Sequence, residues 1–135
     1  MNDNAVHIRE LPNRSNHNCF GCSPINEYGL RMRFFTDGTT VTSNVIVPPH
    51  LCGWDNLVHG GVISTICDEI MSWTALHLLQ RIILTRSMTV EFLRPTLIGQ
   101  ELRAEGIVIE KKSEREALIQ GQIFNPEGEL CARSQ

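Results

Sequence analysis

The sequence predicts an α+β domain in which one long, buried helix packs against one antiparallel sheet. Residues 59–80 are apolar on most sides of a helix, and such a helix is normally buried. Segments before and after it alternate between apolar and polar residues, as half-buried strands do. The chain has 135 residues, enough for one domain with a sizeable core. Packing the helix against one face of a single sheet is the simplest arrangement that buries the apolar residues of the helix and of the strands.

The chain begins with a segment that does not resemble core. Residues 1–18 contain few apolar side chains and include Pro12. We therefore expect an N-terminal arm over residues 1–18 and a single domain over residues 19–135.

A hairpin is expected before the helix. Apolar residues alternate with arginine over residues 30–34, and residues 36–38 (Thr-Asp-Gly) have turn chemistry. Alternation resumes over residues 41–47 and stops at two prolines, which cannot continue a strand ladder. Residues 48–58 follow as an ordered loop.

The predicted helix, residues 59–80, would be roughly 30 Å long at about 1.5 Å per residue. Three further strands and a short final one follow it. Their expected positions are residues 88–92, 101–110, 117–124 and 129–132. Gly106, inside the second of them, is expected to mark a β-bulge.

Composition excludes several classes of protein. The net charge is -3, so binding nucleic acid by phosphate neutralisation is not expected. No run approaches the roughly 18 apolar residues of a membrane span, and the polar N-terminus lacks the apolar region of a secretory signal. The five scattered cysteines do not form a disulfide framework, which predicts a reducing, cytoplasmic location.

Asp68 is the most informative residue of the predicted helix. The residues that share its face are small or polar: Gly61, Ser64, Thr65, Ser72 and Ala75. Another molecule can therefore approach the carboxylate closely, which is typical of a catalytic acid or base. The alternatives are a solvated carboxylate or an internal hydrogen-bond acceptor. Glu69 is the rival carboxylate if the helix is rotated.

His59, Gly60 and Gly61 open the helix. A glycine costs about 1 kcal/mol in a helix relative to alanine, so two of them need a reason. Their bare N–H groups, at the positive end of the helix dipole, suit a ligand carbonyl or anion. The alternative is a close contact with the sheet or a relaxed entry turn. His59 would bind a ligand, orient the loop or cap the helix.

The two candidate regions cannot meet within one helix. Nine residues separate His59 from Asp68, which is about 13.5 Å of rise and about half a turn. If both serve one reaction, the site combines two chains, and a two-fold dimer would contain two such sites.

Two weaker signals remain. Cys19 and Cys22 form a CxxC motif, which needs two further ligands to close a structural zinc site, and no second CxxC or histidine pair exists. Ordinary thiols are the favoured interpretation. The basic turn (Lys111, Lys112 and Arg115) would hold a phosphate or simply be a solvated loop, and the solvated loop is favoured.

These motifs together resemble the hotdog-fold thioesterases, specifically the phenylacetate-pathway (PaaI-type) group. The resemblance covers about residues 18–134. It is carried by the following residues: the His59-Gly60-Gly61 run, Thr65, Asp68-Glu69, Trp73, and residues 85–95 with their Phe-Leu-Arg-Pro ending. Cys19–Cys22 followed by Tyr28-Gly29-Leu30 also looks like the entry segment of many members.

The resemblance implies a five- or six-stranded antiparallel sheet wrapped around the helix, in a homodimer or homotetramer. It also implies hydrolysis of acyl-CoA thioesters without a metal or a separate cofactor, coenzyme A being part of the substrate. The position of Asp68 is that of a general base or nucleophile. The N–H of Gly60 would polarise the thioester carbonyl, and Thr85 would help to hold the attacking water.

One departure concerns the loop before the helix, where Gly53 stands at the place of an asparagine that is a second carbonyl donor in some relatives. Asn56 is a substitute donor from a shifted loop, or this donor is missing. Trp54, Asn56, Gly61 and Thr65 are the expected substrate-binding residues. The alternatives to a thioesterase are a non-hydrolytic acyl-CoA binding module, an acyl-thioester hydratase or dehydratase, and a structural protein held together by zinc.

Overall fold

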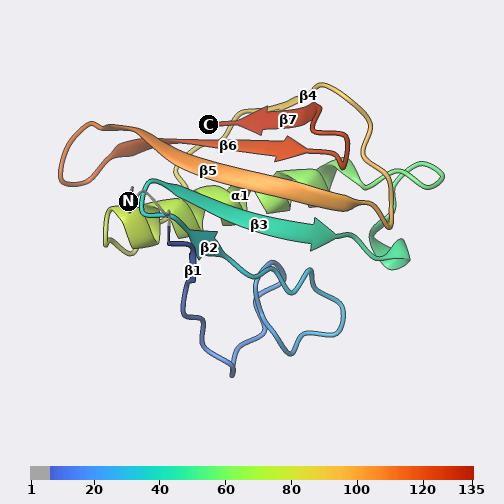
Figure 1. The fold of residues 1–135 in the computed structure, drawn as a ribbon, viewed down its shortest axis with the longest axis horizontal. Coiled ribbons are helices and arrows are strands. Elements are labelled where there is room, and N and C mark those ends of the chain that lie inside the picture. The colour runs from blue at the N-terminus through green and yellow to red at the C-terminus, as the bar shows by residue number, and fades with distance from the viewer. Residues whose placement is uncertain (1–6) are drawn as a thin grey trace, which may run out of the picture.

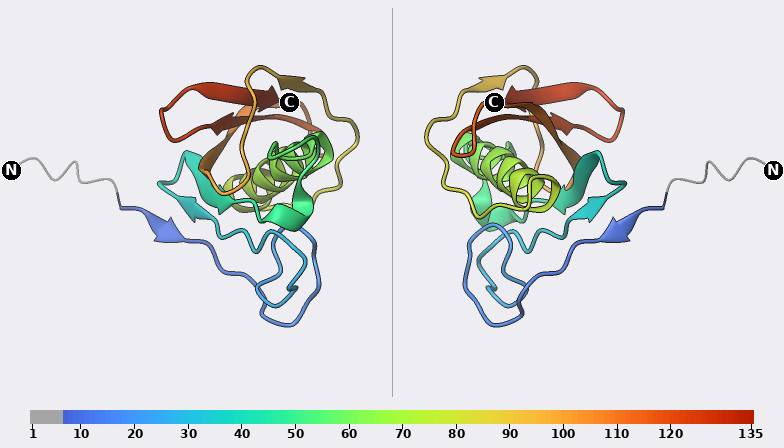
Figure 2. Two further views of the ribbon diagram at one scale, coloured as in Figure 1. Left: turned by 90° about the vertical axis from the view of Figure 1, so that its right-hand side faces the viewer. Right: turned by 90° about the vertical axis from the view of Figure 1, so that its left-hand side faces the viewer.

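A computed structural model, which describes residues 7–135, confirms the α+β arrangement of one long helix on an antiparallel sheet (Figure 1). The sheet has seven strands in the order β1-β2-β3-β5-β6-β7-β4, and every pairing is antiparallel. The strands are β1 (Arg9–Glu10), β2 (Phe35–Thr36), β3 (Thr40–Ile46), β4 (Val90–Phe92), β5 (Glu101–Lys111), β6 (Ala117–Phe124) and β7 (Leu130–Ser134). The helices are the 3-10 turn η1 (Pro49–Leu51) and the long helix α1 (Gly60–Leu78). Figure 2 shows the sheet curled around α1.

The sheet has more strands than the five or six expected because two very short ones extend one edge. Strands β1 and β2 have two residues each, and β1 comes from the predicted arm. Leu11, which follows β1, is only 3% exposed. The described part of the arm therefore contributes to the sheet and the core, while residues 1–6 lie outside the described residues.

The predicted strand over residues 30–34 keeps its alternating burial but does not pair as expected. Leu30, Met32 and Phe34 are buried, yet ladder pairing with β3 begins only at Phe35. The N–H groups of Leu30 and Met32 instead donate to the carbonyls of residues 20 and 21. Arg31 has φ 51°, a left-handed conformation that interrupts an extended strand.

The core lies between α1 and the concave face of the sheet. Nine residues of α1 are buried, among them Ile66, Ile70 and Trp73, and they pack mainly against β3, β5 and β6. The other face of the helix, which carries Ser64, Thr65, Asp68 and Glu69, is only partly covered.

Gly106 does not mark a bulge, contrary to the prediction. It pairs in register with Gly121 of β6, and the irregularity of β5 lies between Val108 and Glu110. A Cβ on Gly106 would come under 3.0 Å from Thr74 of α1. The glycine is therefore needed for the close approach of helix and sheet.

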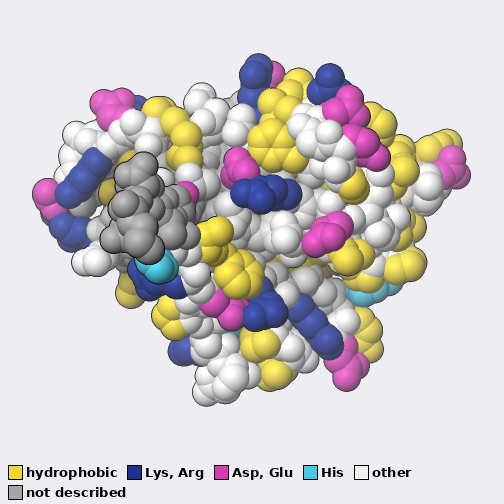
Figure 3. Space-filling model, in the orientation of Figure 1, with side chains coloured by type: hydrophobic (Ala, Val, Ile, Leu, Met, Phe, Trp, Pro, Cys, Tyr) yellow, Lys and Arg dark blue, Asp and Glu magenta, His cyan; other side chains and the backbone are white. Residues whose placement is uncertain are grey.

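Acidic and basic side chains are interspersed on the face shown in Figure 3, with no large patch of one sign. Ion pairs such as Arg103–Glu105 and Arg133–Glu91 contribute to this pattern. Within residues 7–135, no helix has the length and hydrophobicity needed to cross a bilayer.

Candidate active site

The first turn of α1 is organised by His59, which is the N-cap. Its carbonyl oxygen accepts from the N–H groups of Val62 and Ile63, at 2.8 and 3.0 Å. Its ring Nδ1 accepts from the Gly61 N–H at 2.9 Å. In residues 7–135 no acceptor is found for the fourth amide of this turn, that of Gly60. One helix-terminus donor therefore remains available at the exposed start of α1.

Gly60 is not pressed against the sheet. A Cβ at this position would meet only the ring of Phe92 in β4, at 3.7 and 3.9 Å, which is ordinary contact. Gly60 and Phe92 line a cavity of about 260 Å³ together with Thr96 and Cys131. The close-contact explanation for this glycine therefore does not hold, and the bare backbone lies beside a small cavity.

The loop that leads into α1 brings Gly53, Trp54 and Asn56 near the helix start. A Cβ on Gly53 would lie 3.1 Å from Cα of His59, so residue 53 sits against the N-cap. Trp54 is 81% exposed. Asn56 is exposed, and its backbone carbonyl accepts from the N–H of Ile98 at 2.8 Å. Binding of substrate by Trp54 and Asn56 stays a prediction.

Asp68 is hydrogen bonded to Thr85, the residue that the family resemblance implies as a holder of the attacking water. Thr85 lies in the segment between α1 and β4, and its hydroxyl donates to Oδ1 of Asp68 at 2.6 Å. Asp68 is partly exposed and Thr85 is exposed. The hydrogen bond occupies one carboxylate oxygen and the hydroxyl proton, so the other carboxylate oxygen and the hydroxyl lone pairs can still accept.

The polar neighbours of Asp68 on α1 are engaged locally. The hydroxyl of Ser64 donates to the Gly60 carbonyl at 3.0 Å, and that of Thr65 donates to the Gly61 carbonyl at 2.9 Å. These bonds to the preceding turn leave the hydroxyl oxygens free to accept from a ligand. A substrate-binding role for Thr65 stays a prediction.

A large cavity adjoins the Asp68–Thr85 pair. It has a volume of about 840 Å³ and is lined by Thr85, by the α1 residues Met71, Ser72 and Ala75, and by the turn between β5 and β6. Lys111 at the end of β5 and the turn residues Lys112 and Arg115 are basic, and the turn also contains Glu114 and Glu116. Glu114 pairs with Lys111 and with Arg81. The residues of this turn are exposed, as expected for a solvated loop, and they also form part of the cavity wall.

The rival carboxylate, Glu69, faces a different part of the molecule. The Sγ of Cys19 lies 3.5 Å from Oε1 of Glu69. Burial raises the pKa of the Glu69 carboxyl above its ordinary value. The sequence identified the CxxC motif but not this partner, because the contact joins residues 50 positions apart. All five cysteines are free thiols.

The two candidate regions lie on one helix but apart. Eight residues separate Gly60 from Asp68, about 12 Å along α1. A single chain therefore does not bring the Gly60 N–H to the Asp68 carboxylate, as the spacing in the sequence predicts.

Comparison with known proteins gives a family match. The family described as the thioesterase superfamily matches residues 55–132, which include α1 and strands β4 to β6. No curated protein sequence matches this chain.

Solved structures share the fold at low sequence identity. A crystal structure of a thioesterase superfamily protein has a TM-score of 0.77 at 21% identity, covering 87% of this chain and 57% of that one. This chain thus spans little more than half of that protein. The Escherichia coli PaaI protein from the phenylacetic acid degradation operon has a TM-score of 0.65 at 19% identity, covering 71% and 72% of the two chains. A hypothetical thioesterase from Streptococcus pneumoniae, solved with coenzyme A, has a TM-score of 0.66 at 19% identity, covering 71% and 76%. These likenesses confirm the hotdog fold.

Proposed function

Because the chain belongs to the thioesterase superfamily, we propose that it hydrolyses acyl-coenzyme A thioesters to a free carboxylic acid and coenzyme A. The observation that carries this proposal is the 2.6 Å hydrogen bond between Thr85 and Asp68 beside a cavity of about 840 Å³. A partly exposed carboxylate that is fixed by a hydroxyl at the wall of a cavity suits general base catalysis.

In this mechanism Asp68 takes a proton from a water molecule. The Thr85 hydroxyl donates to Asp68 and accepts a hydrogen bond from the same water, which fixes the water beside the base. The water oxygen attacks the thioester carbonyl carbon, the carbon–sulfur bond breaks, and the sulfur of coenzyme A leaves with the proton. Direct attack by Asp68, followed by hydrolysis of an acyl-enzyme, uses the same residues.

The thioester carbonyl needs a donor where negative charge develops, and the N–H of Gly60 is the candidate. An oxyanion donor of this kind contributes about 3–4 kcal/mol to transition-state stabilisation. His59 orients this turn by capping it, and its use of the Gly61 N–H leaves Gly60 as the available donor. Since Gly60 and Asp68 lie about 12 Å apart on α1, we propose that the donor comes from a second copy of the chain across a two-fold axis.

The large cavity supports an elongated substrate with an apolar part and anionic groups. Its volume lies within the roughly 300–1,000 Å³ that small-molecule sites occupy. Met71, Ala75 and Leu79 provide an apolar wall for an acyl group, and Lys112 and Arg115 provide charge for phosphates. Among proteins of the same fold, the Streptococcus mutans protein smu.793 was solved with acetyl CoA.

The test is Asp68→Asn, assayed on short-chain, long-chain and aromatic acyl-CoAs. Loss of a general base lowers kcat by about 10²- to 10⁴-fold, and we expect the circular dichroism spectrum to remain unchanged. Glu110→Gln is the matched control, since Glu110 is an exposed carboxylate of β5 that does not line the cavity. Near wild-type turnover in Asp68→Asn contradicts the assignment of the base. Tight binding of acyl-CoA by the wild-type chain without any turnover contradicts the hydrolase itself.

A further inference from the structure

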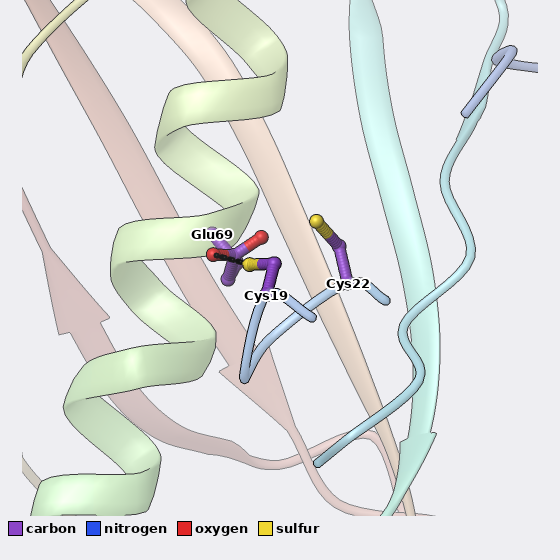
Figure 4. A group of neighbouring side chains, drawn as sticks. All are labelled: Cys19, Cys22 and Glu69. Carbon is purple, nitrogen blue, oxygen red and sulfur yellow. Dashed lines mark hydrogen bonds between the residues drawn. The ribbon is translucent and has the colours of Figure 1, made fainter. Parts of the chain in front are cut away.

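Three potential metal ligands meet where the N-terminal segment crosses α1 (Figure 4). Cys19 and Cys22 lie in a turn that precedes β2, and Glu69 projects toward them from the helix. Their two sulfur atoms and the carboxylate oxygen all lie within 4.8 Å of one another. Among residues 7–135, no other group of three or more histidine, cysteine or acidic side chains is arranged to hold a metal ion. The cluster is separate from the Asp68–Thr85 pair.

We propose that Cys19, Cys22 and Glu69 bind one Zn²⁺ ion that fastens the N-terminal segment to α1. On a tetrahedral zinc ion with Zn–S about 2.3 Å and Zn–O about 2.1 Å, neighbouring ligand atoms are about 3.6–3.8 Å apart. The Sγ of Cys19 already lies 3.5 Å from Oε1 of Glu69. The remaining separations need only small side-chain rotations to reach these values.

The turn that carries the cysteines is held in place by other hydrogen bonds. The side chain of Asn13 donates to the Cys22 carbonyl at 2.7 Å, and the N–H of Met32 donates to the Gly21 carbonyl at 3.0 Å. A Cβ on Gly21 would come under 3.0 Å from the side chain of Glu69. The glycine between the cysteines thus lets the turn lie directly against the carboxylate, so the ligands are arranged in advance.

The electrostatics of the cluster suit a cation. In residues 7–135 no lysine or arginine forms an ion pair with Glu69. A divalent cation held by the Glu69 carboxylate and the two thiolates would supply the positive charge that this cluster lacks.

The donor set favours zinc over harder ions. Ca²⁺ and Mg²⁺ take oxygen ligands, whereas two thiolates and one carboxylate suit a softer ion such as Zn²⁺. The three side chains leave one tetrahedral position for water or for the second carboxylate oxygen. His17 does not occupy it, because its ring nitrogens already contact Asn13 and the Cys19 N–H.

The experiment uses the full chain with no histidine tag, purified under reducing conditions. Its zinc content is measured by elemental analysis. After chelation, Co²⁺ is titrated back while the thiolate-to-cobalt charge-transfer absorption is recorded, and the melting temperature is measured with and without Zn²⁺. We expect one equivalent of metal, a charge-transfer band and a higher melting temperature with zinc.

Substitutions identify the ligands. Cys19→Ser and Cys22→Ser should each remove about half of the charge-transfer intensity or abolish binding, because each removes one of two thiolates. Cys52→Ser is the matched control, since Cys52 is an exposed thiol outside the cluster, and it should bind as the parent does. Glu69→Gln should weaken Co²⁺ binding at least about tenfold while both thiols remain.

The proposal is overturned if the parent shows no charge-transfer band, or if Cys52→Ser loses as much of the band as Cys19→Ser. Unchanged Co²⁺ affinity in Glu69→Gln would show that Glu69 is not a ligand and would contradict the proposed three-residue site. Should Cys22→Ser fail to fold, the partly exposed Cys19 and the isosteric Glu69→Gln variant still decide the outcome. None of these readouts depends on hydrolysis.

Discussion

Gly106→Ala tests the closest contact between helix and sheet. A Cβ at Gly106 would lie under 3.0 Å from Oγ1 of Thr74 and 2.9 Å from the carbonyl oxygen of Ile70. The hydroxyl of Thr74 can rotate, but the carbonyl belongs to the helix backbone, so α1 as a whole must shift. The sequence suggested a bulge at this glycine, where the cost of alanine would come from the backbone conformation of the strand and not from contact with α1.

The magnitude follows from the contacts. Overpacking of this kind costs about 1–3 kcal/mol, and alanine regains about 0.5–1 kcal/mol of the entropy that glycine loses in a strand. Because the short contact is with the backbone, we place the overpacking cost near 3 kcal/mol and expect the free energy of unfolding to fall by about 2 kcal/mol overall. At about 2.1 cal/mol/K per residue, unfolding of the 135-residue chain has an entropy near 0.28 kcal/mol/K. The melting temperature should therefore fall by about 7 °C.

The assay is thermal unfolding followed by circular dichroism, with Thr74→Ala as the second arm of a double-mutant cycle. Thr74→Ala alone loses a buried hydroxyl that donates to the Ile70 carbonyl at 2.6 Å. In the double variant it also removes the contact between the new Cβ and Oγ1, while the contact with the Ile70 carbonyl remains. We expect the double variant to lose about 1 kcal/mol less unfolding free energy than the sum of the losses in the two single variants. Additive losses, or a shift of less than about 2 °C in Gly106→Ala, would refute the packing argument.

Three further outcomes are expected. Gly60→Ala should keep the melting temperature of the parent, because the new methyl group would only touch Phe92 at 3.7 Å. It should lower acyl-CoA hydrolysis at least about tenfold by shielding the free N–H of residue 60. Hydrolysis equal to that of the parent would count against the donor role. Burial lowers the pKa of His77, so protonation favours the unfolded chain; the melting temperature should fall as the pH drops below about 6.5, and less so in His77→Phe. Thr85→Val removes the 2.6 Å hydrogen bond to Asp68 and should lower kcat about tenfold, with steady-state kinetics as the readout. Because both residues are at least partly exposed, the melting temperature should change little.

The elements that the sequence predicted well are those whose pattern is set by local periodicity. The predicted helix 59–80 contains α1 (Gly60–Leu78), and the predicted strands 101–110 and 117–124 match β5 and β6 almost residue for residue. Each element buries one face along its length, so apolar residues recur in the sequence with the period of that helix or strand. The segment over residues 30–34 shows where this reasoning stops. Its burial alternates, but its hydrogen-bond partners are residues 20 and 21, which periodicity cannot identify.

The candidate site likewise contains residues that the sequence could identify and contacts that it could not. The resemblance named both Asp68 and Thr85, and the structure shows that they are hydrogen bonded. The cysteine cluster shows the opposite case, because the CxxC spacing supplies two ligands but not the third. Glu69 lies 50 residues from Cys19, and only the rotation of α1 against the N-terminal segment decides which carboxylate meets the thiols. This rotation depends on the whole core.

Asp68 and Glu69 are adjacent on α1 but contact different segments of the chain. Successive residues of an α-helix are turned by about 100°, so adjacent carboxylates point toward different neighbours. Asp68 turns to Thr85, in the segment that follows α1, and Glu69 turns to Cys19, in the segment that precedes β2. A rotation of α1 by one residue would exchange the two carboxylates, so the packing of Ile66, Ile70 and Trp73 determines which of them faces Thr85. Asp68→Asn should therefore lower kcat by about 10²- to 10⁴-fold while leaving zinc stoichiometry unchanged. A loss of bound zinc in that variant would show that the two sites are not separate.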